Sequence, residues 1–438
     1  MPVARTDPAR LVAFEVLRAV SDQDAYANLE LSRLLRERGV SGRDAALATE
    51  LVGGTLRLQG SYDDILDRLV KGTLQPPVRD ALRLGTHQLL SMRVPTHAAV
   101  TTTVDLVKEQ IGHKPSGLVN AVLRKVAAQD LESWLTDRPR PARTAHPAWV
   151  IDALAEALDR PAELDALLAA DNERPAVVLV ARPGLADVAE LGGSALAASP
   201  YAVELEGGDP GAVPAVREGR AGVQDAGSQL VALVLARAAL EGDDQRWLDV
   251  CAGPGGKAAL LAAIAAERGA GVLANERQRH RAQLVAQGVR AARAGVLGVV
   301  TGDGTRPPWS PGTFDRVLVD APCSGLGALR RRPESRWRRT AADVEELVPL
   351  QVALLDAALD AARPGGVVLY ATCSPVVAET AGVVRTVLER RTDAVVEPAL
   401  DLIGDLEDAE SAHLPGALQL WPHRHRTDAM FLSLLRRR

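Results

Sequence analysis

The stretch Leu-Asp-Val-Cys-Ala-Gly-Pro-Gly-Gly-Lys, at positions 248–257, decides the fold of the C-terminal half of this chain. It joins a short apolar run to a helical run of mostly alanine and leucine. Glycines at such a turn let the backbone reverse sharply and approach a ligand closely. The spacing is neither G-x-G-x-x-G nor G-x-x-x-x-G-K-S/T, so it indicates neither a dinucleotide loop nor a phosphate loop.

Beyond this turn, apolar runs alternate with helical patterns, which predicts a doubly wound α/β sheet. Short apolar runs bounded by glycine or proline are typical of buried parallel strands. The expected strands cover positions 247–251, 271–275, 296–300, 316–319 and 367–371, and later candidates cover 394–397 and 429–435. Residues 221–438 are therefore expected to form an α/β, Rossmann-like domain, whose first helix opens near position 222.

The N-terminal part is expected to be helical, because apolar residues recur there at helical spacing between Gly and Pro signals. The expected helices cover positions 9–20, 27–38, 42–57, 63–70, 77–91, 96–111 and 116–128, within an all-α domain at 1–135. Residues 136–146 are rich in proline and arginine and are expected to form an extended linker. Residues 136–220 as a whole are expected to hold this linker and a small α+β connecting region, with strands at 176–181 and 201–205 and a helix at 185–191.

Composition excludes several classes of protein. Three cysteines make no disulfide framework and favour a reducing compartment. The first residues carry no apolar signal core, and no apolar run is long enough to span a bilayer. A net charge of −5 argues against a general nucleic-acid coat protein. We therefore expect a cytoplasmic protein that acts as a monomer, with no membrane partner.

Three features at successive expected strand ends predict the cofactor. The glycine turn follows the first strand, Glu276 ends the second, and Asp303 follows the third. An acid at the second position can accept both ribose hydroxyls, and an acid at the third can accept from an adenine amine. Each acid alone could simply cap the next helix, but the ordered trio fits S-adenosylmethionine.

Two of the three cysteines have matched settings. Cys323 lies in Asp-Ala-Pro-Cys-Ser-Gly and Cys373 in Ala-Thr-Cys-Ser-Pro, each after an expected strand. Open α/β sheets bind ligands at the carboxyl ends of their strands, so two thiols in one crevice indicate covalent chemistry. The alternative is that both are core cysteines, the usual fate of a free thiol. The neighbouring Asp320 and Ser374 are not typical core residues.

A pyrimidine reaction would use two thiols. Carbon 5 of the ring is a poor nucleophile, and a thiolate that adds to carbon 6 makes carbon 5 electron-rich. After methyl transfer, the carbon-5 proton must leave and the thiol must be eliminated. Asp320 is spaced to hold the N3 edge, and Lys257 could lower a thiol pKa or hold the pyrimidine carbonyl. A base in a duplex cannot reach these groups, so the target must be single-stranded or flipped out.

These motifs resemble those of the Sun (RsmB) family of bacterial RNA 5-methylcytosine methyltransferases, which act on small-subunit ribosomal RNA. The matching positions are 224–225 with 228–229, 248–257, 276 with 281, 302–304, 320–327 with 331 and 332, 370–375 and 427–431. The stretches 25–29, 50–57 and 117–124 resemble the NusB-like helical domain of that family. The resemblance spans essentially the whole chain. The pair of cysteine motifs separates RNA enzymes from DNA cytosine methyltransferases, so no DNA partner is expected.

The resemblance implies a role for each matching residue. Cys373 would be the nucleophile, Cys323 would promote product release, and Asp320 would hold the cytosine edge. The implied cofactor-binding residues are Cys251, Ala252, Gly253, Pro254, Gly255, Gly256, Lys257, Glu276, Arg281, Asp303 and Asp320. Gly253 departs from the family, in which alanine is common at that position. For Cys251 as a thiol, packing is the preferred interpretation, and no metal site is assigned.

An arginine-rich segment follows Cys323. Positions 330–339 hold six arginines and one acid, Glu334. A charge run is most often a solvated face, but its closeness to Cys323 favours RNA contact. The expected RNA-binding residues are Arg330, Arg331, Arg332, Arg336, Arg338 and Arg339.

Three interpretations remain open from the sequence. The first is an RNA cytosine-5 methyltransferase for small-subunit ribosomal RNA, with tRNA as an alternative substrate. The second is a methyltransferase for a protein or small molecule, with incidental cysteines. The third is a non-catalytic RNA-binding factor, which the helical half alone would suggest. The cofactor trio with Lys257 argues against the third, and Asp-Ala-Pro-Cys-Ser argues against the second.

Overall fold

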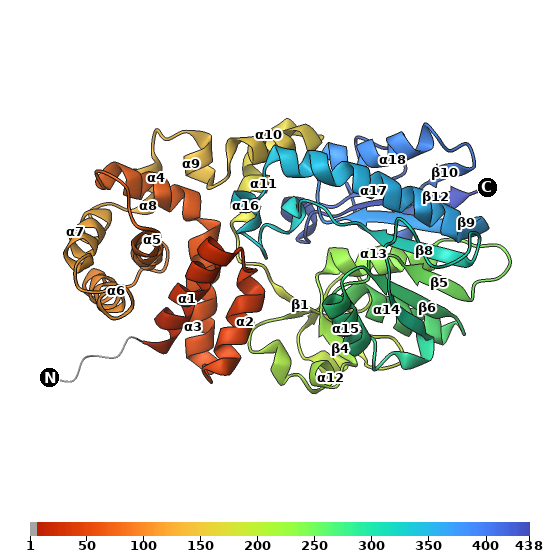
Figure 1. Ribbon diagram of the computed structural model, residues 1–438, viewed down its shortest axis with the longest axis horizontal. Coiled ribbons are helices and arrows are strands. Elements are labelled where there is room, and N and C mark those ends of the chain that lie inside the picture. The colour runs from red at the N-terminus through yellow and green to blue at the C-terminus, as the bar shows by residue number, and fades with distance from the viewer. Residues whose placement is uncertain (1–6) are drawn as a thin grey trace. The chain divides into compact units, whose positions relative to one another are not determined.

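The computed structural model describes residues 7–438, which form two compact units (Figure 1). Unit 1 comprises the residues up to Asp152 together with Leu168–Pro175 and Leu329–Arg338. Unit 2 comprises Ala153–Leu167, Ala176–Ala328 and Arg339–Arg438. The predicted combination of an all-α N-terminal part and an α/β C-terminal part is confirmed. Within the described residues, no helix is long and apolar enough to cross a membrane.

Unit 1 is a helical bundle around a core of leucine, valine and alanine. Its helices are α1 (Pro8–Gln23), α2 (Ala27–Glu37), α3 (Gly42–Arg57), α4 (Gln59–Leu69), α5 (Pro76–Leu90), α6 (Thr96–Gln110), α7 (Ser116–Val126), α8 (Leu131–Leu135) and α9 (Arg140–Thr144), with α16 (Ser335–Arg338) contributed from later in the chain. The first seven match the predicted helices to within four residues at each end. Apolar periodicity locates them well because each buries one face against the shared core.

The expectation of an extended linker at 136–146 is wrong for its second half. Residues Arg140–Thr144 form α9, and Pro141 lies in its first turn. A missing N–H costs no helical hydrogen bond at that position, so proline there is compatible with a helix. Helices α10 (Ala148–Ala157) and α11 (Leu164–Asp171) follow it.

A small antiparallel sheet precedes the large one, in the strand order β2-β3-β1-β4. Its strands are β1 (Val177–Ala181), β2 (Ser194–Ala195), β3 (Ala202–Leu205) and β4 (Ala221–Val223). The two expected strands are present as β1 and β3. The expected helix at 185–191 is only a short 3-10 turn, Val188–Leu191. The helix expected to open in the segment 222–229 is present and begins at Ala226.

The large sheet has the order β10-β12-β9-β8-β5-β6-β7, with β11 paired to β12. Its strands are β5 (Arg246–Asp249), β6 (Gly271–Glu276), β7 (Val296–Thr301), β8 (Phe314–Asp320), β9 (Ala362–Thr372), β10 (Ala394–Glu397), β11 (Leu418–Gln419) and β12 (Phe431–Arg437). Strands β5 to β9 pair in parallel, whereas β12 runs antiparallel between β9 and β10.

Helices cover both faces of this sheet (Figure 1). One face carries α13 (Ala226–Arg237), α14 (Gly256–Glu267) and α15 (Arg279–Gly288), and the other carries α17 (Ala341–Ala361) and α18 (Ala381–Leu388). Strand β9 serves both cores: Leu369 packs into the first and Tyr370 into the second. Chain order reverses at β5, because β6 lies on one side of it and β8 on the other. Such a reversal opens a ligand crevice at the carboxyl ends of the strands.

Candidate active site

The strand ends bring the predicted catalytic and cofactor-binding acids, together with Asp249, to one edge of the sheet. Asp249, Glu276 and Asp320 are the last residues of β5, β6 and β8. Cys373 directly follows β9, and Asp303 lies two residues beyond β7. Because these strands are parallel and neighbouring, the thiol side of the edge lies over β8 and β9 and the cofactor side lies over β5 to β7.

The two cysteine sulfurs are in contact. The Sγ atoms of Cys323 and Cys373 lie 3.5 Å apart, close enough for one thiol to donate to the other sulfur. The hydrogen bond with Cys373 raises the pKa of Cys323 well above its usual value, and burial and the charge of Glu379 add to the rise. Cys323 therefore holds its proton more tightly than an ordinary thiol does.

Lys257 and Asp320 form an ion pair beside the cysteines. The Lys257 Nζ lies 2.9 Å from Oδ2 of Asp320, and both side chains are largely shielded from solvent. Burial by itself would lower the pKa of Lys257. The charges of Asp320, Cys373 and Asp249 outweigh burial and raise the pKa. Lys257 therefore stays protonated. Its positive charge interacts with Cys373 and favours the thiolate form of that side chain.

Asp249 and Cys251 lie close enough to interact with this ion pair, and both hold their protons tightly. Asp249 is 1% exposed, and its Oδ1 accepts from the Cys251 amide at 3.3 Å. Burial, followed by the charge of Asp320, raises the pKa of Asp249 to about 8. Burial and the surrounding acids also raise the pKa of the Cys251 thiol well above its usual value. A thiol that holds its proton is a weak nucleophile, so packing remains the preferred role of Cys251.

The glycine turn places the start of α14 close to its neighbours. Gly255 has φ of 114°, and a Cβ there would lie 3.0 Å from the Cα of Val285. Apart from its chain neighbours and the nearby backbone of its own helix, no heavy atom lies within 4 Å of where a Cβ on Gly256 would be. The turn thus combines a close backbone approach on one side with open space on the other, as a bound ligand requires.

Glu276 lies against this turn. A Cβ on Gly253 would come within 2.0 Å of Oε2 of Glu276, so the glycine makes room for the carboxylate. Arg281 is 3.6 Å from the same oxygen and donates to the Gly253 carbonyl at 2.7 Å. The Glu276 Oε1 accepts from the Gln278 amide at 2.9 Å.

Asp303 also forms a local turn. Its Oδ1 accepts from the amide and the hydroxyl of Thr305, at 3.0 and 2.8 Å. These hydrogen bonds lower the pKa of Asp303 and keep it ionised. Two carboxylates at neighbouring strand ends, beside an open glycine turn, fit the ribose and the adenine of S-adenosylmethionine.

A further carboxylate, Glu379, was missed at the level of sequence. It is fully buried and accepts hydrogen bonds from Ser324 and Ser374, the residues that follow the two cysteines. Gln351 of α17 also donates to it, at 3.0 Å. The repeated Cys-Ser pair was the available signal, because two buried hydroxyls need a common acceptor.

The predicted RNA-binding arginines are divided between the two units. Positions 330–338 belong to unit 1, and only Arg339 belongs to unit 2. Arg330 and Arg336 are 7% and 0% exposed, so the expectation that these two contact RNA is wrong. The Arg336 guanidinium donates to the carbonyl oxygens of Arg57, Ala145 and Asp171 and to Oδ1 of Asn172. Arg332 and Arg338 lie over the ring of Tyr26, at 5.4 and 5.6 Å.

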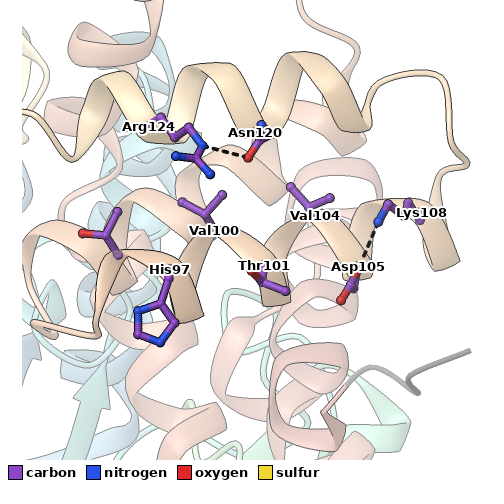
Figure 2. A pocket seen from close by; sticks show the side chains of 9 residues that line it. His97, Val100, Thr101, Val104, Asp105, Lys108, Asn120 and Arg124 are labelled. Atoms are coloured by element: carbon purple, nitrogen blue, oxygen red, sulfur yellow. Dashed lines mark hydrogen bonds and ion pairs between the residues drawn. The ribbon is translucent and has the colours of Figure 1, made fainter.

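A separate groove lies on unit 1, between α6 and α7 (Figure 2). Its volume is about 490 Å³, and none of the predicted catalytic residues lines it. Lys108 pairs with Asp105 at 3.0 Å on α6, and Arg124 donates to Asn120 at 3.3 Å on α7. Within residues 7–438, no group of three His, Cys, Asp or Glu side chains is placed to hold a metal ion.

Comparison with known proteins identifies the family. Residues 237–436 match the family model described as 16S rRNA methyltransferase RsmB/F, and residues 7–128 match that of the NusB family. The ribosomal RNA small subunit methyltransferase B of Escherichia coli O6:K15:H31 is 34% identical over 424 residues, covering 93% of this chain and 95% of that protein. The protein Rv1407 of Mycobacterium tuberculosis is 50% identical over 455 residues, covering 98% and 97%. The chain belongs to the RsmB/F methyltransferase family.

The fold of this family member also matches solved structures. The crystal structure of PH0851 has a TM-score of 0.81 at 22% identity and covers 99% of both chains. NSun6 from Pyrococcus horikoshii, solved with SFG, has a TM-score of 0.57 at 17% identity and covers 66% of this chain and 98% of that one. As in its family, S-adenosylmethionine is the methyl donor, which agrees with the fit of Glu276, Asp303 and the glycine turn.

Proposed function

We propose that this chain transfers a methyl group from S-adenosylmethionine to carbon 5 of a cytosine in 16S ribosomal RNA, through a covalent cysteine–pyrimidine intermediate. The observation that carries the proposal is the contact between Cys323 and Cys373, at 3.5 Å, beside the Lys257–Asp320 ion pair. A methyltransferase acting on an amine needs no thiol, because the nitrogen has its own lone pair. The name of the 34% identical relative supports ribosomal RNA as the substrate.

The cofactor side of the edge would hold the methyl donor. Glu276 would accept from the ribose hydroxyls, Asp303 from the adenine amine, and the turn at Cys251–Gly256 would face the methionine part. Arg281, which pairs with Glu276, would orient that carboxylate. When bound, S-adenosylmethionine supplies an electrophilic methyl group on a positively charged sulfur.

Cys373 would attack carbon 6 of the cytosine. The Lys257 cation lies close enough to interact with the Cys373 sulfur, whereas Cys323 carries a raised pKa. The thiolate of the pair is therefore assigned to Cys373 and the thiol to Cys323. Asp320 would bind the N3 edge of the ring while it keeps Lys257 in place. Addition forms the C6–S bond and moves the electrons of the C5–C6 double bond onto carbon 5, which takes the methyl group.

Cys323 would act at release. The hydrogen bond to Cys373 is the largest cause of its raised pKa, and this cause disappears once the Cys373 sulfur is bonded to carbon 6. Cys323 can then lose its proton to solvent and take the carbon-5 proton. The C–H electrons restore the double bond, the C6–S bond breaks, and Cys373 leaves as a thiolate. The pair returns to its starting state, and one proton is released for each methyl transferred.

The other parts of the chain would serve the RNA. We propose that residues 1–135 position the substrate, that 136–220 connect the two functional domains, and that 221–438 carry out the chemistry. The exposed Arg332, with Arg331, Arg338 and Arg339, remains the candidate RNA contact of the arginine segment. A cytoplasmic location would follow from the ribosomal RNA substrate, and tRNA stays the alternative substrate.

Bisulfite sequencing of ribosomal RNA from cells with and without the gene tests the proposal. One small-subunit cytosine should be protected in the parent strain and converted in the deletion strain. Complementation with the parent gene should restore protection, and complementation with Cys373→Ala should not. Identical conversion of small-subunit RNA in all strains would contradict the ribosomal RNA assignment, and the same comparison on tRNA would reveal the alternative.

A further inference from the structure

Glu379 connects the two cysteine loops. It ends the short turn Val377–Glu379 after β9 and is 0% exposed. Its Oε1 accepts from the Ser324 amide at 2.7 Å and from Gln351 at 3.0 Å. Its Oε2 accepts from the hydroxyls of Ser324 and Ser374, both at 2.6 Å. The two hydroxyl oxygens are 3.0 Å apart.

This arrangement links four segments of unit 2 through one carboxylate. Ser324 and Ser374 each follow a cysteine directly, so bonds from both to one Glu379 oxygen restrict the separation of Cys323 and Cys373. Gln351 also donates to the Pro322 carbonyl at 2.9 Å, which ties the first loop to α17. A buried carboxylate is costly unless hydrogen-bonded. Here the donors satisfy both oxygens and make the geometry rigid.

The carboxylate also makes the surroundings of the two sulfurs unequal. The charge of Glu379 contributes to the raised pKa of Cys323, after the hydrogen bond to Cys373 and burial. On the other side, Lys257 interacts with Cys373 and is paired with Asp320. Tyr370 faces the same centre, and burial raises its pKa well above the usual value, so it stays neutral. An anion thus lies near Cys323 and a cation near Cys373.

We propose that Glu379 is a positioning residue that holds the two Cys-Ser loops together and keeps the proton of the cysteine pair on Cys323. This inference rests on the proposed thiol mechanism, because it explains how two neighbouring cysteines take different roles. The side chain of Glu379 accepts hydrogen bonds from the two serines that follow the cysteines. It acts through Ser324 and Ser374 and through its charge.

The test compares alkylation of the two cysteines in the full-length protein without RNA. Initial rates of iodoacetamide labelling at Cys323 and Cys373 are measured by peptide mass spectrometry from pH 6 to 9. In the parent protein, Cys373 should label faster than Cys323. In Glu379→Gln, which preserves shape and removes charge, Cys323 labelling at a given pH should rise about tenfold, the effect of lowering its pKa by about one unit.

Methylation supplies the second readout. With Glu379→Gln, kcat for RNA methylation should fall about tenfold and its pH profile should shift, while the KM for S-adenosylmethionine stays within about twofold. Unchanged labelling at Cys323 together with an unchanged pH profile of kcat would overturn the inference. If Glu379→Gln does not fold, Ser324→Ala and Ser374→Ala replace it, because each removes one donor. Each should narrow the difference between the two labelling rates, and an unchanged difference in both would overturn the inference.

Asp315→Asn is the matched control. Asp315 is also buried, at 4% exposed, and its carboxylate accepts from the backbone amides of Gln245 and Arg246 at the opposite end of β8. The Asp315→Asn substitution should lower the melting temperature of the protein without changing the ratio of the labelling rates at Cys323 and Cys373. Labelling needs no RNA, so a parent protein that fails to methylate RNA would refute the proposed function alone. An unaltered ratio of the two labelling rates in an active Glu379→Gln enzyme would refute the positioning role of Glu379 alone.

Discussion

The Nζ atom of Lys257 lies 2.9 Å from Oδ2 of Asp320, at the point where the first turn of α14 meets the end of β8. This pair joins the two sides of the site. Lys257 follows the glycine turn on the cofactor side, and Asp320 precedes the Cys323 loop on the thiol side. One ion pair therefore connects the glycine turn to the strand that precedes the Cys323 loop.

Replacing Lys257 with methionine removes the cation near Cys373 while keeping an apolar stem of similar length. The initial rate of Cys373 alkylation at pH 7 should fall about tenfold, because its thiolate loses a favourable charge. RNA methylation should fall by at least the same factor. Peptide mass spectrometry and a methyl-transfer assay measure the two effects. Equal Cys373 labelling in variant and parent would show that Lys257 does not activate this thiol.

Alanine variants of the two cysteines should fail at different steps of the reaction. Cys373→Ala should abolish both methylation and any covalent adduct. Cys323→Ala should still add and methylate, then remain linked to RNA because the carbon-5 proton is not removed. A denaturing gel with substrate RNA and S-adenosylmethionine separates these outcomes. A retarded band from Cys373→Ala and none from Cys323→Ala would reverse the assignment. The absence of any adduct alongside full activity in both would falsify the thiol mechanism.

Glu276→Ala and Asp303→Ala should each weaken S-adenosylmethionine binding by about 1–3 kcal/mol, because each leaves hydrogen-bond donors of the ligand without an acceptor. Isothermal titration calorimetry measures the change. Glu397→Ala is a useful control, because Glu397 pairs with Arg436 and not with the turn. Parent-like affinity in both strand-end variants would remove these two residues from the cofactor site.

Asp249 should make stability depend on pH. Its pKa is raised to about 8 in the folded protein from 3.8, so the folded state holds a proton that the unfolded chain releases. The stability contributed by this proton is present below pH 4 and is lost as the pH rises to about 8. Asp249→Asn mimics the protonated form and should not show this loss. The parent should therefore lose about 1.4 kcal/mol per pH unit relative to the variant between pH 5 and 8. Urea unfolding at several pH values measures this, and parallel curves would contradict it.

Removing the N-terminal bundle should expose the arginine segment and leave the cofactor site intact. A fragment from Ala145 to Arg438 lacks Arg57, whose carbonyl accepts from the buried Arg336. The fragment should still bind S-adenosylmethionine, but trypsin should cut it within 330–339 much faster than it cuts the full chain. Titration calorimetry and mass spectrometry of the digest give the two readouts. Equal protection of the segment in both would show that the bundle does not shield it.

Local patterns were enough to predict the elements that position the site. Glu276 and Asp320 end β6 and β8 as expected, because a buried strand must stop where its apolar run stops. The position of the arginine segment could not be predicted in this way. A run of arginines normally indicates a solvent-exposed surface. Arg336 is buried only because backbone carbonyls from distant positions in the sequence surround it.

Glu379 shows the same limit at the active site. In sequence it is a single acid after Thr-Cys-Ser-Pro, without a charged neighbour on either side. Its role depends on Ser324, which lies 55 positions earlier and reaches it only after β8 and β9 have paired. Contacts of this kind are set by strand pairing and not by periodicity, so single-sequence patterns do not contain them.

The membership of Leu329–Arg338 in unit 1 affects how the protein folds during synthesis. The chain leaves unit 1 after Asp152, returns for Leu168–Pro175, and supplies its last piece only at Arg338. The ribosome must therefore translate 338 of the 438 residues before the helical bundle has all of its parts. Domains usually fold in order from the N-terminus as they emerge. Here the segment that carries Arg336 joins the N-terminal bundle only after β5 to β8 have already been made.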